Sequence, residues 1–82
     1  MKRSREIAVA PFYRILRQEG ASRVSREAAT KLRDIVEELA REIARESWAL
    51  AQHARRKTVV GEDVVFAARR VLKQVRISEL EV

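Results

Sequence analysis

The sequence contains no cysteine and only one histidine, His53, among its 82 residues. Without cysteine no disulfide and no thiolate metal site can form, and a single histidine nearly excludes a zinc site built from one chain. The sequence also shows no nucleophile paired with a base and no phosphate-binding loop motif. We therefore expect no enzyme activity, no cofactor and no bound metal.

No apolar run approaches the roughly 18 residues that a membrane-spanning helix requires. The basic start, MKRSRE, is not followed by the apolar segment of an export signal. A basic helix lying on a membrane is also disfavoured, because the cations of the central segment alternate with acids. These features predict a cytoplasmic protein without a membrane partner, and the length fits one small domain.

Glycine and proline are scarce and are confined to Pro11, Gly20 and Gly61. The 40 residues between the two glycines contain neither breaker, and their apolar positions recur at steps of three and four, which is typical of an amphipathic helix. Ser25 is suited to cap the start of this helix. We therefore predict a helix over residues 26–54, roughly 43 Å long.

The charged residues of this central helix predict a solvent-exposed face. Glu37 and Arg41 are four residues apart, and Glu42 and Arg45 are three apart, which are spacings at which opposite charges pair on a helix surface. Arg33 is interpreted as part of the same exposed face.

Two shorter helices are predicted on either side of the central one. The first begins at Pro11 and is closed by Gly20, and the last runs from the second glycine to about Val75, with acids at its start and cations near its end. The segments 23–25 and 58–60 are rich in β-branched residues and are interpreted as brief extended loops able to pair. The predicted fold class is all-α: short helix, long helix, short helix.

The length of the central helix implies a partner. A helix of roughly 43 Å cannot be covered by two flanking helices of three or four turns each. Its remaining apolar surface, with Trp48 in the core or at the seam, needs other apolar surface to pack against. A symmetric homodimer is the simplest source of that surface.

Positive charge is concentrated in two stretches of a chain whose net charge is +6. Arginine supplies 14 of the 18 cations, and its forked guanidinium binds phosphate through two parallel hydrogen bonds. Residues 1–26 and 55–76 each hold seven cations and two acids, whereas residues 27–54 and 77–82 each have a net charge of −2. The two cationic flanks favour a polyanionic partner.

Three motifs occur in order along this pattern: APxxRIL at residues 10–16, GAxRVS at 20–25, and AxHAxRKT followed by EDV at 51–64. Each motif alone is weak. At these spacings, and within these helices, the three together resemble an archaeal histone over roughly residues 7–73. The resemblance implies the histone fold, in which two chains clasp head to tail as an obligate dimer.

The resemblance also implies a surface for double-stranded DNA, made of paired loops and the starts of the first helices. It implies that Arg14 contacts phosphate from the first helix and that Arg23 reaches into the minor groove from the first loop. In the second loop, Lys57 and Thr58 would bind phosphates. Arg55 stands where the family often has glycine, which adds a cation to that loop.

A second contact implied by the resemblance joins one dimer to the next. Arg56 would pair with Asp63 of the same chain and hold the second loop in shape. His53 would meet Asp63 of a neighbouring dimer, with Leu50 and Phe66 packed beside it. This four-helix bundle would join dimers as a closed tetramer or as a DNA-wrapped filament.

Simpler interpretations stand beside several of these roles. Gly20 would let successive filament turns approach closely, or would only close the first helix. Arg23 is also placed to pair with Glu27. Thr58 is suited to bond a nearby main-chain group, and His53 to lie half-buried at a helix end.

The ends of the chain and two valines depart from the family pattern. Residues 1–6 are interpreted as a basic N-terminal arm, residues 7–75 as the histone-fold domain, and residues 76–82 as a tail that lengthens the last helix or packs elsewhere. Val60 and Val65 stand where polar residues are common. They suit stronger packing between dimers or contact with another protein.

The sequence thus predicts a chromatin protein of the nucleoid that binds, wraps and compacts double-stranded DNA with little sequence preference. Minor-groove arginines and the bendability of the duplex would give only weak positional preference. Its protein partner would be itself or a paralogous histone. The alternative is a histone-fold subunit that forms heterodimers within a regulatory complex.

Overall fold

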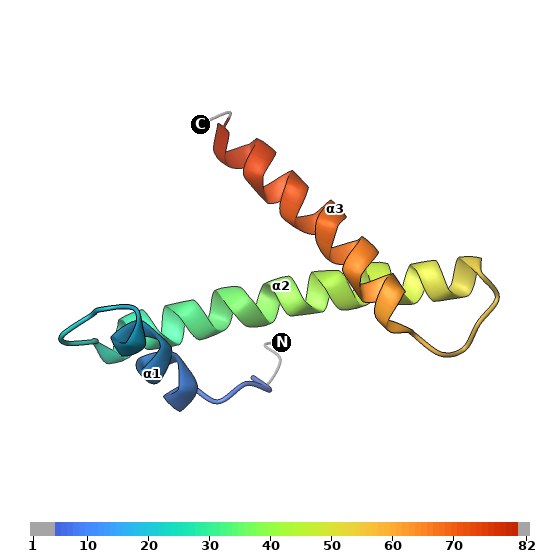
Figure 1. The fold of residues 1–82 in the computed structure, drawn as a ribbon. Helices are drawn as coiled ribbons and strands as arrows, with labels where there is room; N and C mark the ends of the chain where they lie inside the picture. The colour runs from blue at the N-terminus through green and yellow to red at the C-terminus, as the bar shows by residue number, and fades with distance from the viewer. Residues whose placement is uncertain (1–4, 81–82) are drawn as a thin grey trace. The chain divides into compact units, whose positions relative to one another are not determined.

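The computed structural model describes residues 5–80, with side chains described as far as Lys73. Residues 1–4 of the predicted arm and 81–82 of the predicted tail lie outside this range. The helices follow the predicted order: α1 (Ala10–Gln18), α2 (Arg26–His53) and α3 (Gly61–Leu80) (Figure 1). No strand occurs in the described range, and the two segments predicted to pair are irregular loops in this single chain.

Chain breakers set the ends of α1. The helix begins at Ala10, one residue before the predicted Pro11, and Val9 precedes it without a side-chain cap. It closes where Gly20 adopts a φ of 119°, a left-handed conformation that favours glycine. The N–H groups of Gly20 and Ala21 donate to carbonyls of the last turn, in the pattern that closes many helices. Gly20 therefore ends α1, whatever further role it has.

The start of α2 agrees with the sequence prediction, whereas the end of α3 does not. The Ser25 Oγ accepts the N–H of Ala28 at 3.0 Å, which confirms the predicted cap. α2 ends at His53, one residue early. The predicted end of α3 near Val75 was wrong, because the helix continues to Leu80. No glycine or proline follows the first residue of α3, so no breaker stops it.

The chain forms two compact units that meet within α2: an N-terminal unit of residues 1–38 and a C-terminal unit of residues 39–82. Within the N-terminal unit, Phe12 and Ala29 are buried. Within the C-terminal unit, the buried apolar residues are Ala51, Ala67 and Val71. Three of these five side chains are alanine, so a single chain buries little apolar surface.

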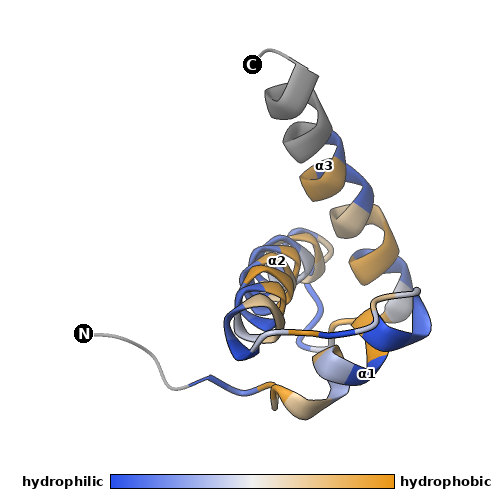
Figure 2. Ribbon diagram, turned by 90° about the vertical axis from the view of Figure 1, so that its left-hand side faces the viewer, coloured by the Kyte–Doolittle hydropathy of each residue, from blue (hydrophilic) through white to orange (hydrophobic). Residues whose placement is uncertain are grey.

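Much apolar surface is left exposed by the single chain. Figure 2 shows hydrophobic residues along α2 and α3 beside hydrophilic ones. Trp48 is 43% exposed, and Phe66 is 55% exposed. The large hydrophobic residues that remain exposed among the described side chains are Ile15, Ile35, Val36, Trp48, Val59, Val60, Val64, Val65, Phe66 and Leu72. Exposed apolar surface of this extent marks an interaction surface.

Candidate nucleic-acid interface

The loop between α2 and α3 begins with a helix-closing turn. The N–H groups of Arg55 and Arg56 donate to the carbonyls of Gln52 and Ala51, each at 2.9 Å. This hydrogen-bond pattern places the first residue beyond the helix cap in the left-handed conformation, and Arg55 has a φ of 58° there. Glycine is the usual residue at such a position because it has no Cβ. Here the position holds an exposed arginine.

Arg56 and Asp63 form a forked ion pair that closes this loop. Arg56 NH1 and NH2 lie 2.9 and 3.0 Å from Oδ2 and Oδ1 of Asp63. NH1 also donates to the Thr58 carbonyl at 2.9 Å, and the Val60 N–H donates to Asp63 Oδ2 at 2.9 Å. Asp63 lies in the first turn of α3, so one carboxylate both caps that helix and holds the loop. The structure thus brings the predicted partners together and adds two main-chain contacts that the sequence did not indicate.

The ion pair also shifts the acidity of its members. The hydrogen bond from Arg56, helped by the Val60 N–H, lowers the pKa of Asp63 to about 2, while burial acts in the opposite direction. The hydrogen bond to Asp63 raises the pKa of Arg56. Asp63 is only 6% exposed. The carboxylate is therefore ionised and sheltered near neutral pH, and it holds the loop through charge-assisted bonds.

Three phosphate-binding candidates are exposed in the closed loop. Arg55, Lys57 and Thr58 all lie at the surface, whereas Arg56 is half-buried. The Thr58 carbonyl is already engaged by Arg56, which fixes the main chain beside Lys57. Two cations and a hydroxyl on a fixed loop can neutralise and hydrogen-bond phosphate oxygens.

The other two DNA-binding candidates belong to the N-terminal unit. Arg14 is exposed on α1, and Arg23 is exposed in the loop between α1 and α2. Arg23 lines a shallow, mainly apolar hollow together with Leu16 and Val24. Among the described residues, no ion pair joins Arg23 to Glu27, its alternative partner.

The residues predicted to join dimers lie close to the loop. His53 is the last residue of α2 and is exposed. Leu50, three residues earlier, lines a shallow hollow with Glu62, Asp63 and Phe66. The structure therefore gathers Leu50, Asp63 and Phe66 at one place on the C-terminal unit.

The hydrogen bonds of Asp63 bear on whether it can also bind a neighbour's His53. Arg56 occupies one position on each carboxylate oxygen, and the Val60 N–H occupies a second position on Oδ2. A carboxylate offers about four acceptor positions. One position on Oδ1 is left for another donor.

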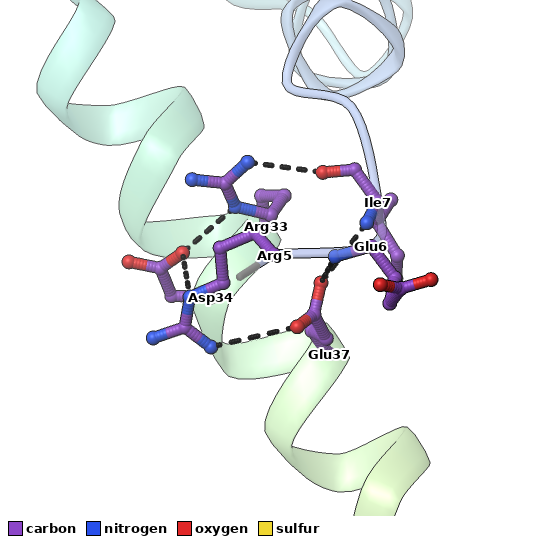
Figure 3. Close-up of polar contacts among 6 residues, drawn as sticks. All are labelled: Arg5, Glu6, Ile7, Arg33, Asp34 and Glu37. Carbon is purple, nitrogen blue, oxygen red and sulfur yellow. Dashed lines mark hydrogen bonds and ion pairs between the residues drawn. The ribbon is translucent and has the colours of Figure 1, made fainter. Parts of the chain in front are cut away.

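The sequence analysis missed a second buried acid. Glu37 was assigned to an exposed face, but it is 2% exposed and accepts the N–H groups of Glu6 and Ile7 (Figure 3). Arg33 was assigned to the same face, and its side chain is only 16% exposed. Arg33 and Glu37 lie four and eight residues after the buried Ala29, so helical spacing places them near the buried face. That spacing was the available signal.

Two classes of site are not found in the described part of the chain. Among its acids and its histidine, no group of three or more could hold a metal ion. None of its helices is long and apolar enough to cross a membrane.

Comparisons with known proteins agree with one another. A family model described as histone-like transcription factor (CBF/NF-Y) and archaeal histone matches residues 5–68. Probable archaeal histone 3 of Methanocaldococcus jannaschii is 53% identical over 64 residues, which are 78% of this chain and 96% of that protein. One subunit of the archaeal histone HAN1 of Thermococcus zilligii is 44% identical over 64 residues, with the same coverage of the two chains.

The ion pair predicts how stability depends on pH. The pKa of Asp63 is about 2 in the folded chain, below the value of about 3.9 for a free aspartate. Ionised Asp63 therefore stabilises the fold above about pH 4, and this contribution is lost as pH falls towards 2. The Tm advantage of the wild-type chain over Asp63→Asn should shrink across that range in thermal unfolding followed by circular dichroism.

Glu62→Gln is the matched control, because it removes the exposed acid next to Asp63. Its Tm difference from wild type should not show the same convergence. A Tm difference between wild type and Asp63→Asn that stays constant down to pH 2 would contradict the role given to the ion pair.

Proposed function

The chain belongs to the family of archaeal histones and histone-like transcription factors, and from this premise we propose that it is a chromatin protein that binds, wraps and compacts double-stranded DNA as a homodimer. The observation that carries the proposal is the loop closed by Arg56 and Asp63, which leaves Arg55, Lys57 and Thr58 exposed on a fixed main chain. Fixed cations bind phosphate with less loss of conformational freedom than mobile ones.

The exposed apolar surface supports a dimer. Few apolar side chains are buried in one chain, whereas ten large ones are exposed among the described residues. A head-to-tail homodimer would cover much of that surface and bring each loop of one chain beside a loop of the other. The binding surface would then contain two copies of every cation.

The N-terminal unit would add its own contacts. Arg14 would bind phosphate from α1, and Arg23 would enter the minor groove. Contacts of this kind neutralise the backbone and read groove shape more than base identity. The dimer would therefore bind most duplexes, with preference for easily bent ones, and would be associated with the nucleoid.

Dimers would assemble along the DNA through the C-terminal unit. His53 of one dimer would donate to the remaining position on Asp63 of the next, with Leu50 and Phe66 packed around the contact. Repetition of this contact would build a tetramer or a filament. Gly20, which has nothing within 4 Å of a built Cβ, would allow close approach of successive turns.

A second candidate function is supported by one observation. Val60 and Val65 are 39% and 53% exposed, and valine gives nothing to a phosphate. They suit a heterodimer or a further protein contact, as in a regulatory complex. A chain that elutes alone as a homodimer and shifts duplex DNA would favour the chromatin function over this alternative.

The first test is the salt dependence of DNA binding. If a dimer neutralises about six to ten phosphates, log affinity should fall against log salt with a slope of about −5 to −9. Lys57→Gln removes two phosphate contacts from a dimer, so it should make the slope shallower by about 1.8. Lys31→Gln, which removes an exposed lysine from α2, should leave the slope unchanged. A wild-type affinity independent of salt would rule out the proposal.

Arg55 should show opposite effects on folding and binding. Arg55→Gly relieves the left-handed backbone and should raise the free energy of unfolding by about 1 kcal/mol, while it weakens DNA binding. Arg55→Ala keeps the Cβ, so it should weaken binding equally without the gain in stability. Chemical denaturation and DNA titration measure the two effects. Unchanged DNA affinity in both variants would remove Arg55 from the interface.

Assembly is tested by nuclease digestion of DNA saturated with the protein. Regular steps in protected length would indicate dimers adding along a filament, and one fixed length a closed particle. His53→Ala leaves the Arg56–Asp63 pair intact, so it should abolish the longer fragments without weakening the binding of one dimer to a short duplex. Asp63→Ala should weaken assembly more than that single-dimer binding. Long fragments that persist in His53→Ala would contradict the proposed contact.

A further inference from the structure

The chain just before α1 is held against α2 by a cluster of polar contacts, which we call the N-terminal clamp (Figure 3). Glu37 Oε1 accepts the N–H groups of Glu6 and Ile7 at 2.8 and 3.0 Å. Arg33 NH1 donates to the Ile7 carbonyl at 2.9 Å, and its Nε donates to Asp34 Oδ1 at 2.7 Å. The clamp thus consists of Arg33, Asp34 and Glu37 of α2 with the main chain of residues 6 and 7.

Arg5 completes the clamp from the chain end. Its Nε lies 3.4 Å from Asp34 Oδ1, and its NH1 lies 3.7 Å from Glu37 Oε2. Glu37 is 2% exposed, and burial of such a charge is unfavourable unless it is paired and hydrogen-bonded, as it is here. The first residues of most domains are poorly ordered unless they are tied down. Here buried charges tie down the chain close to its start.

The clamp immediately follows a cationic segment. Residues 1–5 contain Lys2, Arg3 and Arg5 and no acid. Lys2 is three residues from Arg5, so a span of at most about 10 Å separates their Cα atoms. Chain length alone therefore keeps Lys2 and Arg3 close to the clamp, and α2 decides where that place is.

We propose that the N-terminal clamp positions Lys2 and Arg3 against the phosphates of bound double-stranded DNA, with Glu37 and Arg33 as the positioning residues. The inference rests on the proposed DNA-binding function and adds a contact to it. A short tether from a fixed point holds the two cations at a high effective concentration near the duplex. It also reduces the conformational freedom that they lose on binding.

The direction of one mutational effect separates positioning from simple charge. Glu37 is an acid in a protein that binds a polyanion, so on charge alone its removal should tighten binding. Glu37→Leu keeps a helix-forming residue of similar size but removes the acceptor of the Glu6 and Ile7 N–H groups. If the clamp positions the cations, binding should weaken. Glu38→Leu is the matched control, because it removes an exposed acid from the next position.

The experiment uses the full chain and a short DNA duplex at several salt concentrations. Glu37→Leu and Glu38→Leu are measured in the wild-type background and in the double variant Lys2→Gln, Arg3→Gln. Hydrogen exchange at the amides of residues 6 and 7 reports directly on the clamp, and thermal unfolding reports on the fold. Arg33→Lys, which keeps the charge but loses the forked reach, provides a second variant if Glu37→Leu fails to fold.

The double variant should show a shallower salt slope than wild type. Glu37→Leu should weaken wild-type binding by up to about eightfold for each phosphate contact that it removes, at about 0.1 M salt. It should have no further effect in the double variant, because the cations that it positions are already gone. Glu38→Leu should not weaken binding in either background. Amide exchange at residues 6 and 7 should rise only when the clamp is changed.

Two results would overturn the inference while leaving the proposed function intact. An equal loss of affinity from Glu37→Leu in both backgrounds would mean that the clamp only stabilises the fold. An unchanged salt slope in the Lys2→Gln, Arg3→Gln variant would mean that these cations do not contact DNA. A wild-type chain without DNA affinity would overturn the proposed function itself, and the inference with it.

Discussion

The proposed interface depends on the ion pair between Arg56 and Asp63. Through the Thr58 carbonyl and the Val60 N–H, this pair fixes the main chain on both sides of the exposed cations. Exposed ion pairs contribute little to stability, but this carboxylate is 6% exposed and is shared by two partners. Its loss would leave a guanidinium and an N–H without their acceptor, which is more costly than the loss of a surface contact. Loop shape and the start of α3 therefore stand or fall together.

Several features of the single chain are unfavourable for its folding alone. Arg55 takes a left-handed conformation in which glycine would be less strained, and its guanidinium is exposed. Large side chains such as Trp48 and Phe66 remain exposed, while the buried apolar residues are mostly alanine. These features are consistent with a functional unit larger than one chain, in which apolar surface meets a partner and exposed cations meet phosphate.

The elements that the sequence predicted correctly depend on local patterns. Helical periodicity and the Ser25 cap placed α2, and ordered motifs identified the family, so the all-α histone fold is confirmed. The end of α3 was missed because nothing in the sequence marks it. The burial of Glu37 was missed because it depends on Glu6 and Ile7, about thirty residues earlier, and local charge spacing does not report such a contact. The DNA contacts themselves stay predictions.

The two buried acids, Glu37 and Asp63, are used in the same way in this cationic protein. Each accepts main-chain N–H groups from a neighbouring irregular segment, and each carries an arginine partner, Arg5 or Arg56. Each segment so held adjoins cations. An acid near a phosphate-binding surface would normally oppose binding, but a buried acid paired with arginine presents little negative charge to the solvent. Burial therefore lets the chain use carboxylates to fix the segments that carry its cations.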